Sequence, residues 1–298
     1  MKILVTGGTV FVSKYVAQYY VNKGCEVYVL NRNSRPQVED VHLLEADRHN
    51  CKEVLKGHYF DAVLDVTAYT AEDVKDLLAG LEGFGQYIMI SSSAVYPEKN
   101  SQPFTEGQSV GLNKFWGQYG TDKIGAEEAL LQAVPKAYIL RPPYLYGPMN
   151  NVYREAFVFE CAEKKRKFYV PKDGSMQLQF FYVGDLCKVM DAILAKEPAE
   201  HIINVGNEGT VNVLDWVKMC YDVVGAPLEI ANVDESIEQR KYFSFYDYEY
   251  KLDMSRQKAL LDKTTDLCEG LQEAYDWYQS NKSEVKRKEF IAFIDEYF

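Results

Sequence analysis

The amino-acid sequence predicts an α/β fold, with a doubly wound parallel sheet covered by helices on both faces and a smaller C-terminal α/β lobe. Two observations lead to this prediction. Short apolar segments rich in β-branched residues alternate with helical segments through the first half of the chain. A glycine-containing turn also joins the first strand segment to the first helical one, which gives a β-turn-α-β unit within about 30 residues. Repeats of this unit require strands that run in one direction, and therefore a parallel sheet.

The predicted elements follow one another in a regular order up to residue 141. Residues 2–5 form a strand, 12–22 a helix that ends near Gly24, and 26–30 the second strand. The alternation continues with strand 41–45, helix 51–55, strand 62–66, helix 71–81, strand 87–91, helix 123–133 and strand 137–141.

The pattern becomes less regular after Pro148. Helices are predicted at 152–165, 186–196 and 213–225, and strands at 167–171, 179–183 and 202–205. The last segment, 267–298, is predicted to be helical. We expect the sheet-bearing domain at residues 1–150. Residues 151–298 are expected to form mainly a substrate-binding lobe, with some of its segments returning to the sheet.

Composition bounds the class of protein. The chain has 298 residues and a formal net charge of −11, with 47% hydrophobic and 26% charged residues. These values are typical of a folded globular protein with a sizeable core, and they exclude a disordered chain. An acidic surface repels phosphate backbones, so we expect no nucleic-acid partner. No run of about 18 uncharged apolar residues is present, so we expect no membrane span.

The six cysteines bear on the compartment. None of them forms a CxxC pair or accompanies a histidine cluster, so we expect no metal site. We expect buried free thiols, which fit a reducing compartment. The sequence opens on a strand pattern, without the basic and long apolar regions of a signal peptide. Together these features predict a cytoplasmic location.

The turn over residues 6–13 lies between a predicted strand and a predicted helix. Such a turn directs backbone N–H groups and a helix N-terminus at a pyrophosphate. Its place in a β-turn-α-β unit gives it more weight than a simple strand-to-helix turn would have. We therefore predict a Rossmann dinucleotide-binding domain whose first cofactor contacts are Thr6, Gly7, Gly8, Thr9, Val10, Phe11 and Val12.

The end of the second strand bears on the choice between NAD and NADP. An acidic residue at this place would bind the ribose 2′-hydroxyl of NAD. The sequence has Asn31 followed by Arg32, with Arg35 nearby. A neutral residue beside arginines suits a 2′-phosphate, so we predict NADP in preference to NAD. The alternative interpretation of this stretch is a loop with two solvated arginines that bind no cofactor.

Tyr119 and Lys123 form a YxxxK pair at the start of a predicted helix, where a spacing of four places both side chains on one face. An ammonium favours the ionised phenol, and the tyrosine can then take or give a proton at a hydroxyl or carbonyl while hydride moves to or from a nicotinamide. The spacing also occurs at residues 19–23 and 278–282. Only the pair at 119 and 123 follows a strand whose end carries hydroxyls, at residues 91–93.

Five stretches occur in the order expected for the NAD-dependent epimerase/dehydratase family of extended short-chain dehydrogenases/reductases, and the resemblance spans nearly the whole chain: TGGTVFVS, ISSSAVY, YGTDKIGAEE, LRPPYLYGP and FFYVGDL. The resemblance implies that Ser92 carries the catalytic hydroxyl, with Ser91 and Ser93 as alternatives. It implies further cofactor contacts and a homodimer that includes the helix bearing Tyr119. The implied contacts are Asp47, Arg48, Thr67, Ala68 and Tyr69.

The sequence also departs from that family. Val10 and Ser13 stand where the family carries glycine, and Leu178 replaces an arginine that binds the substrate pyrophosphate. The acidic pair of sugar dehydratases is Ser93-Ala94 here, which disfavours dehydration and leaves epimerisation or carbonyl reduction of a sugar or nucleotide sugar. Candidate substrate contacts are Ser93, Tyr144, Arg154 and Tyr182; Arg141 is either a substitute phosphate ligand or a structural arginine.

Several stretches resemble a divergent group that includes chloroplast stem-loop RNA-binding proteins. These are Asn31-Arg32, Asp47-Arg48, residues 65–69 and Gln179-Phe180. Two alternatives to an enzyme therefore remain. One is an RNA-binding or regulatory protein on a retained Rossmann scaffold, which the net charge of −11 opposes. The other is a sensor that binds dinucleotide without turnover.

Overall fold

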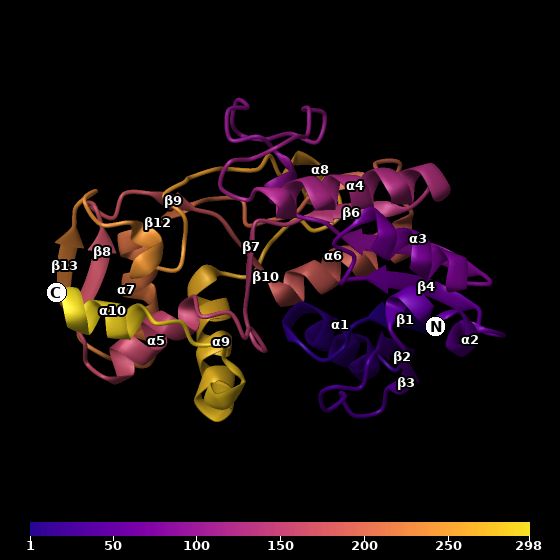
Figure 1. Cartoon of the computed structure of the whole chain (residues 1–298), viewed down its shortest axis with the longest axis horizontal. Coiled ribbons are helices and arrows are strands. Elements are labelled where there is room, and N and C mark those ends of the chain that lie inside the picture. Colours follow the sequence, from indigo (N-terminus) through magenta and orange to yellow (C-terminus); the bar gives the residue numbers. More distant parts are fainter. The chain divides into compact units, whose positions relative to one another are not determined.

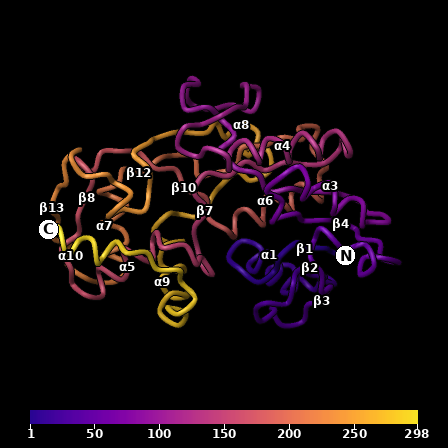
Figure 2. The backbone as a smooth tube through the Cα atoms, in the orientation of Figure 1, coloured from indigo at the N-terminus to yellow at the C-terminus, as the bar shows by residue number.

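The computed structural model describes residues 1–298, whose path can be followed by colour in Figure 2. The chain divides into two compact units, and each is assembled from three separate segments. Unit 1 comprises Met1–Pro143, Val183–Gly206 and Leu252–Lys263. Unit 2 comprises Tyr144–Tyr182, Asn207–Lys251 and Thr264–Phe298.

Unit 1 is built on a seven-stranded sheet in the order β11-β6-β5-β4-β1-β2-β3. All neighbouring strands are parallel, which confirms the predicted fold class. The strand order reverses at β1, whose neighbours are β2 on one side and β4 on the other, and ligands of such sheets bind at the carboxyl ends of the strands beside this point. The strands are β1 (Lys2–Thr6), β2 (Glu26–Asn31), β3 (His42–Glu45), β4 (Phe60–Asp65), β5 (Phe84–Ile90), β6 (Tyr138–Arg141) and β11 (Ile202–Asn204).

Helices cover both faces of this sheet. Side chains of successive strand residues point to opposite faces, and in β1 both sets are buried. Leu4 packs in a cluster with Val74 and Leu130, whereas Ile3 and Val5 are fully buried on the other face. Helix α3 packs on α4, and α1 packs on α6 (Figure 1). The helices of unit 1 are α1 (Phe11–Asn22), α2 (Lys52–Leu55), α3 (Ala71–Gly80), α4 (Gln118–Ala133), α6 (Val183–Lys196) and α8 (Ser255–Lys258).

Unit 2 has no central sheet. Its strands form three short pairs: β7 with β10 and β8 with β13 are parallel, and β9 with β12 is antiparallel. Helix α7 packs on both α5 and α9 (Figure 1), and Gly225 caps its C-terminus in the left-handed conformation. The elements are β7 (Tyr144–Tyr146), α5 (Glu155–Glu163), β8 (Phe168–Pro171), β9 (Gln177–Leu178), β10 (Phe180–Tyr182), β12 (Val211–Asn212), α7 (Val213–Val224), β13 (Ile230–Val233), α9 (Leu267–Asn281) and α10 (Phe290–Tyr297).

The segment 267–298, predicted to be helical, contains two helices separated by a break. Helix α9 ends at Asn281, a single 3-10 turn follows, and α10 begins only at Phe290. Between the two helices the chain becomes extended, because Val285 is buried and the Lys286 N–H donates to the Asn151 carbonyl. Pairing with a neighbouring segment therefore interrupts a sequence whose local pattern is helical.

The cysteines are all free, as expected, but they are not all buried. Cys51, Cys161, Cys187 and Cys220 are buried, whereas Cys268 is exposed on α9. Cys25 is partly exposed where the chain enters β2. None of the helices has the length and apolar character needed to cross a membrane.

Candidate functional site

The turn after β1 depends on its two glycines. Gly7 and Gly8 both have φ of +88°. A Cβ on Gly7 would lie 2.8 Å from Ser13 Oγ, and a Cβ on Gly8 would lie 2.6 Å from Val29 Cγ1. Backbone geometry and packing therefore both require glycine at these two positions.

The substitutions at Val10 and Ser13 are accommodated. Val10 is the N-cap of α1 with φ −138°, an extended conformation that suits a β-branched residue. The Ser13 hydroxyl is buried and donates to the Val10 carbonyl at 2.9 Å. No side chain caps α1, and its first turn holds no acidic residue, so the helix N-terminus is suited to an anion. These features fit the pyrophosphate of a dinucleotide.

Asn31, at the end of β2, holds neighbouring loops together. Its amide group donates to the Gly7 carbonyl at 2.7 Å and to Gln37 Oε1 at 3.0 Å. The next residue, Arg32, has a side chain that is 75% exposed, with Nη1 3.7 Å from Asp47 Oδ2. Arg35 is also exposed. The end of β2 thus presents a neutral amide and two exposed guanidinium groups.

Asp65 ends β4 as a fully buried carboxylate that organises the strand ends. It accepts hydrogen bonds from Thr6 Oγ1 at 2.7 Å, Tyr87 Oη at 2.6 Å and Arg48 Nη2 at 2.9 Å. Burial opposes the charge on Arg48, but Asp65 raises the pKa of that guanidinium overall. The Thr6 hydroxyl also accepts from the Thr67 N–H at 3.1 Å. The side chains of Thr6 and Arg48 therefore support the site from within the fold.

Lys123 lies at the carboxyl ends of β4 and β5. Its ammonium donates to the Ala68 carbonyl at 2.6 Å and to the Ile90 carbonyl at 2.9 Å. The side chain is buried, and burial lowers the pKa of Lys123 to about 8. Tyr119, one helical turn earlier on α4, is 39% exposed, and its ring lies 6.4 Å from that of Tyr69. The pair singled out in the sequence is thus a buried ammonium beside an accessible phenol.

The three serines after β5 differ in their surroundings. Ser91 is buried and donates to Glu127 Oε1 at 2.5 Å. Ser93 is buried in the following 3-10 turn. Ser92 is partly exposed, and its hydroxyl caps that turn by accepting from the Ala94 N–H at 3.1 Å. Ser92 is therefore the most accessible of the three serines.

Arg141 is a structural arginine. Its guanidinium is buried and makes two contacts with the Glu127 carboxylate, at 2.9 and 2.5 Å. It also donates to Tyr96 Oη at 2.9 Å, which in turn donates to Asn204 Oδ1 at 2.7 Å. This network joins α4, β6 and β11. Sequence reasoning missed Glu127, although it stands four residues after Lys123 on the same helix face.

The other two YxxxK pairs have structural contacts. Tyr19 Oη and Lys23 Nζ both contact Asp191 Oδ2, at 2.5 and 2.6 Å, and so connect α1 to α6. In unit 2, the ring of Tyr278 is buried, with Lys282 Nζ at 5.3 Å from its centroid. Tyr19 and Lys23 lie at the C-terminal end of α1, away from the glycine turn at its start.

Two of the predicted substrate contacts of unit 2, Tyr144 and Tyr182, belong to an aromatic cluster with Tyr146 and Phe180. Tyr144 is buried, and the Arg154 guanidinium lies 5.5 Å from its ring centroid. Tyr182 is also buried and hydrogen-bonds through its hydroxyl to Glu273. Arg154 alone of these three is partly exposed.

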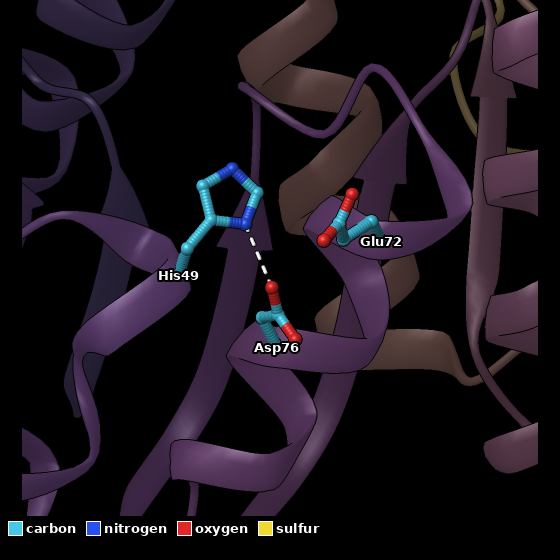
Figure 3. Close-up of side chains that lie close together, drawn as sticks. All are labelled: His49, Glu72 and Asp76. Carbon is cyan, nitrogen blue, oxygen red and sulfur yellow. Dashed lines mark hydrogen bonds and ion pairs between the residues drawn. The ribbon is translucent and has the colours of Figure 1, made fainter.

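His49, Glu72 and Asp76 form a surface group that the sequence did not indicate (Figure 3). Their potential ligand atoms lie within 4.8 Å of one another. Nδ1 of His49 is 2.7 Å from Asp76 Oδ2, and this hydrogen bond raises the pKa of the imidazole. A charge-assisted pair already accounts for the geometry, so we assign no metal to it.

Comparison with known proteins identifies similar chains. The sequence model of the NAD dependent epimerase/dehydratase family matches residues 3–206. The chain is 28% identical over 302 residues to the chloroplast stem-loop binding protein of 41 kDa b of Arabidopsis thaliana, covering 92% of this chain and 78% of that protein. It is 25% identical over 272 residues to the UDP-glucose 4-epimerase of Corynebacterium glutamicum, an alignment that covers 76% of this chain and 82% of that protein. Its fold is similar to that of UDP-glucuronic acid 4-epimerase of Bacillus cereus, which was solved in complex with UDP-glucuronic acid and NAD. The TM-score is 0.74 at 20% sequence identity, and the match covers 94% of this chain and 99% of that chain.

Proposed function

Because the chain belongs to the NAD dependent epimerase/dehydratase family, we propose that it is an NADP(H)-using epimerase or carbonyl reductase of a sugar or nucleotide sugar. The family match confirms the family and the enzyme class that the sequence predicted. One observation carries the specific reaction. The buried ammonium of Lys123 and the accessible phenol of Tyr119 lie one turn apart on α4. Lys123 donates to the Ile90 carbonyl at the end of β5, two residues before the partly exposed Ser92.

Each residue has a distinct role in this proposal. The Tyr119 phenol exchanges a proton with a substrate hydroxyl or carbonyl, and Ser92 orients the same oxygen by a hydrogen bond. The positive charge of Lys123 stabilises the ionised form of the phenol. A bound nicotinamide supplies or accepts the hydride. The turn over residues 6–12 holds the pyrophosphate through its backbone amides.

Substrate chemistry follows from the residues beside Ser92. Ser93 and Ala94 are both buried and neutral, so this place offers no carboxyl group for eliminating water from a sugar. Epimerisation and reduction need only hydride transfer and the proton exchange at Tyr119. The relatives named as epimerases support a nucleoside diphosphate sugar as the first class to test. Within unit 2, the partly exposed Arg154 is the candidate contact for its phosphates.

NADP is the proposed cofactor on the basis of charge. The amide of Asn31 is engaged by Gly7 and Gln37, and it offers no carboxylate to a ribose diol. Arg32 is largely exposed and can turn from Asp47 to a 2′-phosphate. NAD, which is bound in the similar Bacillus cereus structure, is the competing cofactor.

Assembly and location complete the proposal. A homodimer through the face of α4 is proposed from the family resemblance. Six free cysteines support a reducing compartment such as the cytoplasm. A monomeric mass by light scattering would contradict the dimer.

The test combines cofactor binding with turnover. Wild type and Arg32→Ala are titrated with NADP(H) and NAD(H) by calorimetry and nicotinamide fluorescence. The same proteins, with Tyr119→Phe as the inactive control, are then incubated with UDP-glucose, UDP-glucuronic acid and 4-keto nucleotide sugars. We expect NADP(H) to bind more tightly than NAD(H), Arg32→Ala to remove that preference, and Tyr119→Phe to abolish turnover. Turnover unaffected by Tyr119→Phe would overturn the mechanism. Binding of structured RNA without binding of either dinucleotide would favour the RNA-binding alternative.

A further inference from the structure

Tyr69 lies on the loop between β4 and α3, beside both Lys123 and Tyr119. The residue is 51% exposed, yet its loop is fixed. The backbone N–H groups of Tyr69 and Thr70 both donate to Asp73 Oδ2 at 2.8 Å. Thr70 and Asp73 form a reciprocal capping box at the start of α3. The position of the Tyr69 backbone is therefore set by the helix that follows it.

The ring of Tyr69 covers the Lys123 ammonium. Nζ lies 4.7 Å from the ring centroid, within the range in which a cation is attracted to the face of an aromatic ring. Two of the three N–H donors of the ammonium are engaged by the carbonyls of Ala68 and Ile90. Ala68 immediately precedes Tyr69, so one short segment supplies both a carbonyl and a ring to the same cation.

We propose that Tyr69 is a positioning residue of this site, whose ring face holds Lys123 in its charged form at the ends of β4 and β5. The ring acts through Lys123, and the Tyr69 hydroxyl has no part in this role. The inference deepens the proposed function and rests on it for its catalytic consequence. The structural relationship between ring and ammonium can be tested without any substrate.

The charged form of Lys123 depends on a balance. Burial lowers its pKa to about 8, and Arg48 acts in the same direction. The carboxylates that oppose this lowering are Asp65 on β4, Glu127 on α4 and Asp73 on α3. A pKa of about 8 lies close to neutral pH, so a small change in the surroundings of Lys123 alters the fraction that is protonated. Attraction to the ring face of Tyr69 is expected to increase that fraction.

The test measures the titration of Lys123 directly. Ligand-free protein labelled with ¹³Cε-lysine is titrated by NMR from pH 6 to 11, with the Lys123 signal assigned by its loss in Lys123→Met. The variants are Tyr69→Leu, which removes the ring, and Tyr69→Phe, which removes only the hydroxyl. Tyr59→Leu serves as the matched control, because Tyr59 is another exposed tyrosine of unit 1. Circular dichroism verifies that each variant is folded.

We expect Tyr69→Leu to lower the pKa of Lys123 by about 0.5 pH unit or more, while Tyr69→Phe and Tyr59→Leu leave it unchanged. On a substrate identified by the screen, the alkaline limb of kcat/KM should move to lower pH in Tyr69→Leu and recover in Tyr69→Phe. An unchanged Lys123 titration in Tyr69→Leu would overturn the proposal, as would an equal shift in Tyr69→Phe. If the wild type binds no dinucleotide and turns over no substrate, the proposed function is wrong. The NMR result still tests the role of Tyr69, because the titration uses ligand-free protein.

Discussion

The side chain of Ser13 occupies the space into which a side chain at Gly7 would point: a Cβ on Gly7 would lie 2.8 Å from the Ser13 hydroxyl oxygen. The hydroxyl in turn donates to the carbonyl of Val10. Because Gly7 has no side chain, there is room for the serine side chain at position 13. The turn keeps its shape with only two glycines because Ser13 fills part of the space inside it.

Gly7→Ala should damage both the turn and the cofactor site. The substitution adds a close contact with Ser13 to the strain of φ +88°, which costs on the order of 1–3 kcal/mol. We expect dinucleotide affinity, measured by calorimetry, to fall about tenfold or more. Gly24→Ala is the control, since Gly24 has φ +76° and a Cβ added there would meet nothing within 4 Å. Equal losses of dinucleotide affinity in the two variants would show that steric contact at the turn is unimportant.

Glu155→Gln should make the stability of the protein less dependent on pH. Glu155 is buried on α5, its Oε1 accepts from Asn150 Nδ2 at 2.6 Å, and burial raises its pKa. The folded state therefore retains a proton that the unfolded chain releases at about pH 4.3, so stability falls as the pH rises from that value through the folded pKa. Glutamine removes this dependence and preserves the contact with Asn150.

Urea denaturation at pH 5 and pH 8 measures the effect. We expect Glu155→Gln to lose less stability than wild type between pH 5 and pH 8, because it has no carboxyl group to ionise. The exposed Glu53→Gln on α2 is the control. A difference in stability from wild type that is the same at both pH values would show that ionisation of Glu155 is not its cause.

Breaking the pair between Glu127 and Arg141 should be severe. Both side chains are buried, so Arg141→Met leaves an unpaired carboxylate inside unit 1. The expected loss is about 3–5 kcal/mol in the free energy of unfolding. The double variant Glu127→Leu/Arg141→Met should recover much of this loss, because it removes both charges. If the single variant lost less than about 1 kcal/mol, the pair would have to be more hydrated than its burial indicates.

Thiol labelling should separate the cysteines into two groups. Cys268 is exposed and should react first with a disulfide reagent, followed by the partly exposed Cys25. The other four should react only after unfolding, since burial raises the pKa of Cys51 and takes that of Cys161 to about 12. Counting released thiolate before and after denaturant checks this. Rapid reaction of Cys187 or Cys220 in the native protein would contradict the packing of α6 or α7.

Features with a local cause could be predicted from the sequence. The strand-turn-helix pattern around Gly7 and the alternation that follows it are properties of short segments, and the parallel sheet forms as they indicate. Contacts between distant segments could not be read in this way. Nothing local marks Glu127 as the partner of Arg141, or Asp65 as that of Arg48, because only the sheet brings these residues together. The interruption at Val285 likewise depends on burial and on pairing with residue 151.

The order of segments along the chain has a consequence for how the protein can be cut and how it emerges from the ribosome. Strand β11 completes the sheet of unit 1 beside β6, but it is synthesised only after residues 144–182, which belong to unit 2. Until then β6 presents an unpaired edge of backbone N–H and C=O groups, the kind of surface that recruits strands from other molecules. A fragment that stops at residue 150 keeps this edge permanently. We therefore expect such a fragment to aggregate. A variant in which a short linker replaces residues 144–182 keeps β11 to cover the edge of β6, and we expect it to aggregate less.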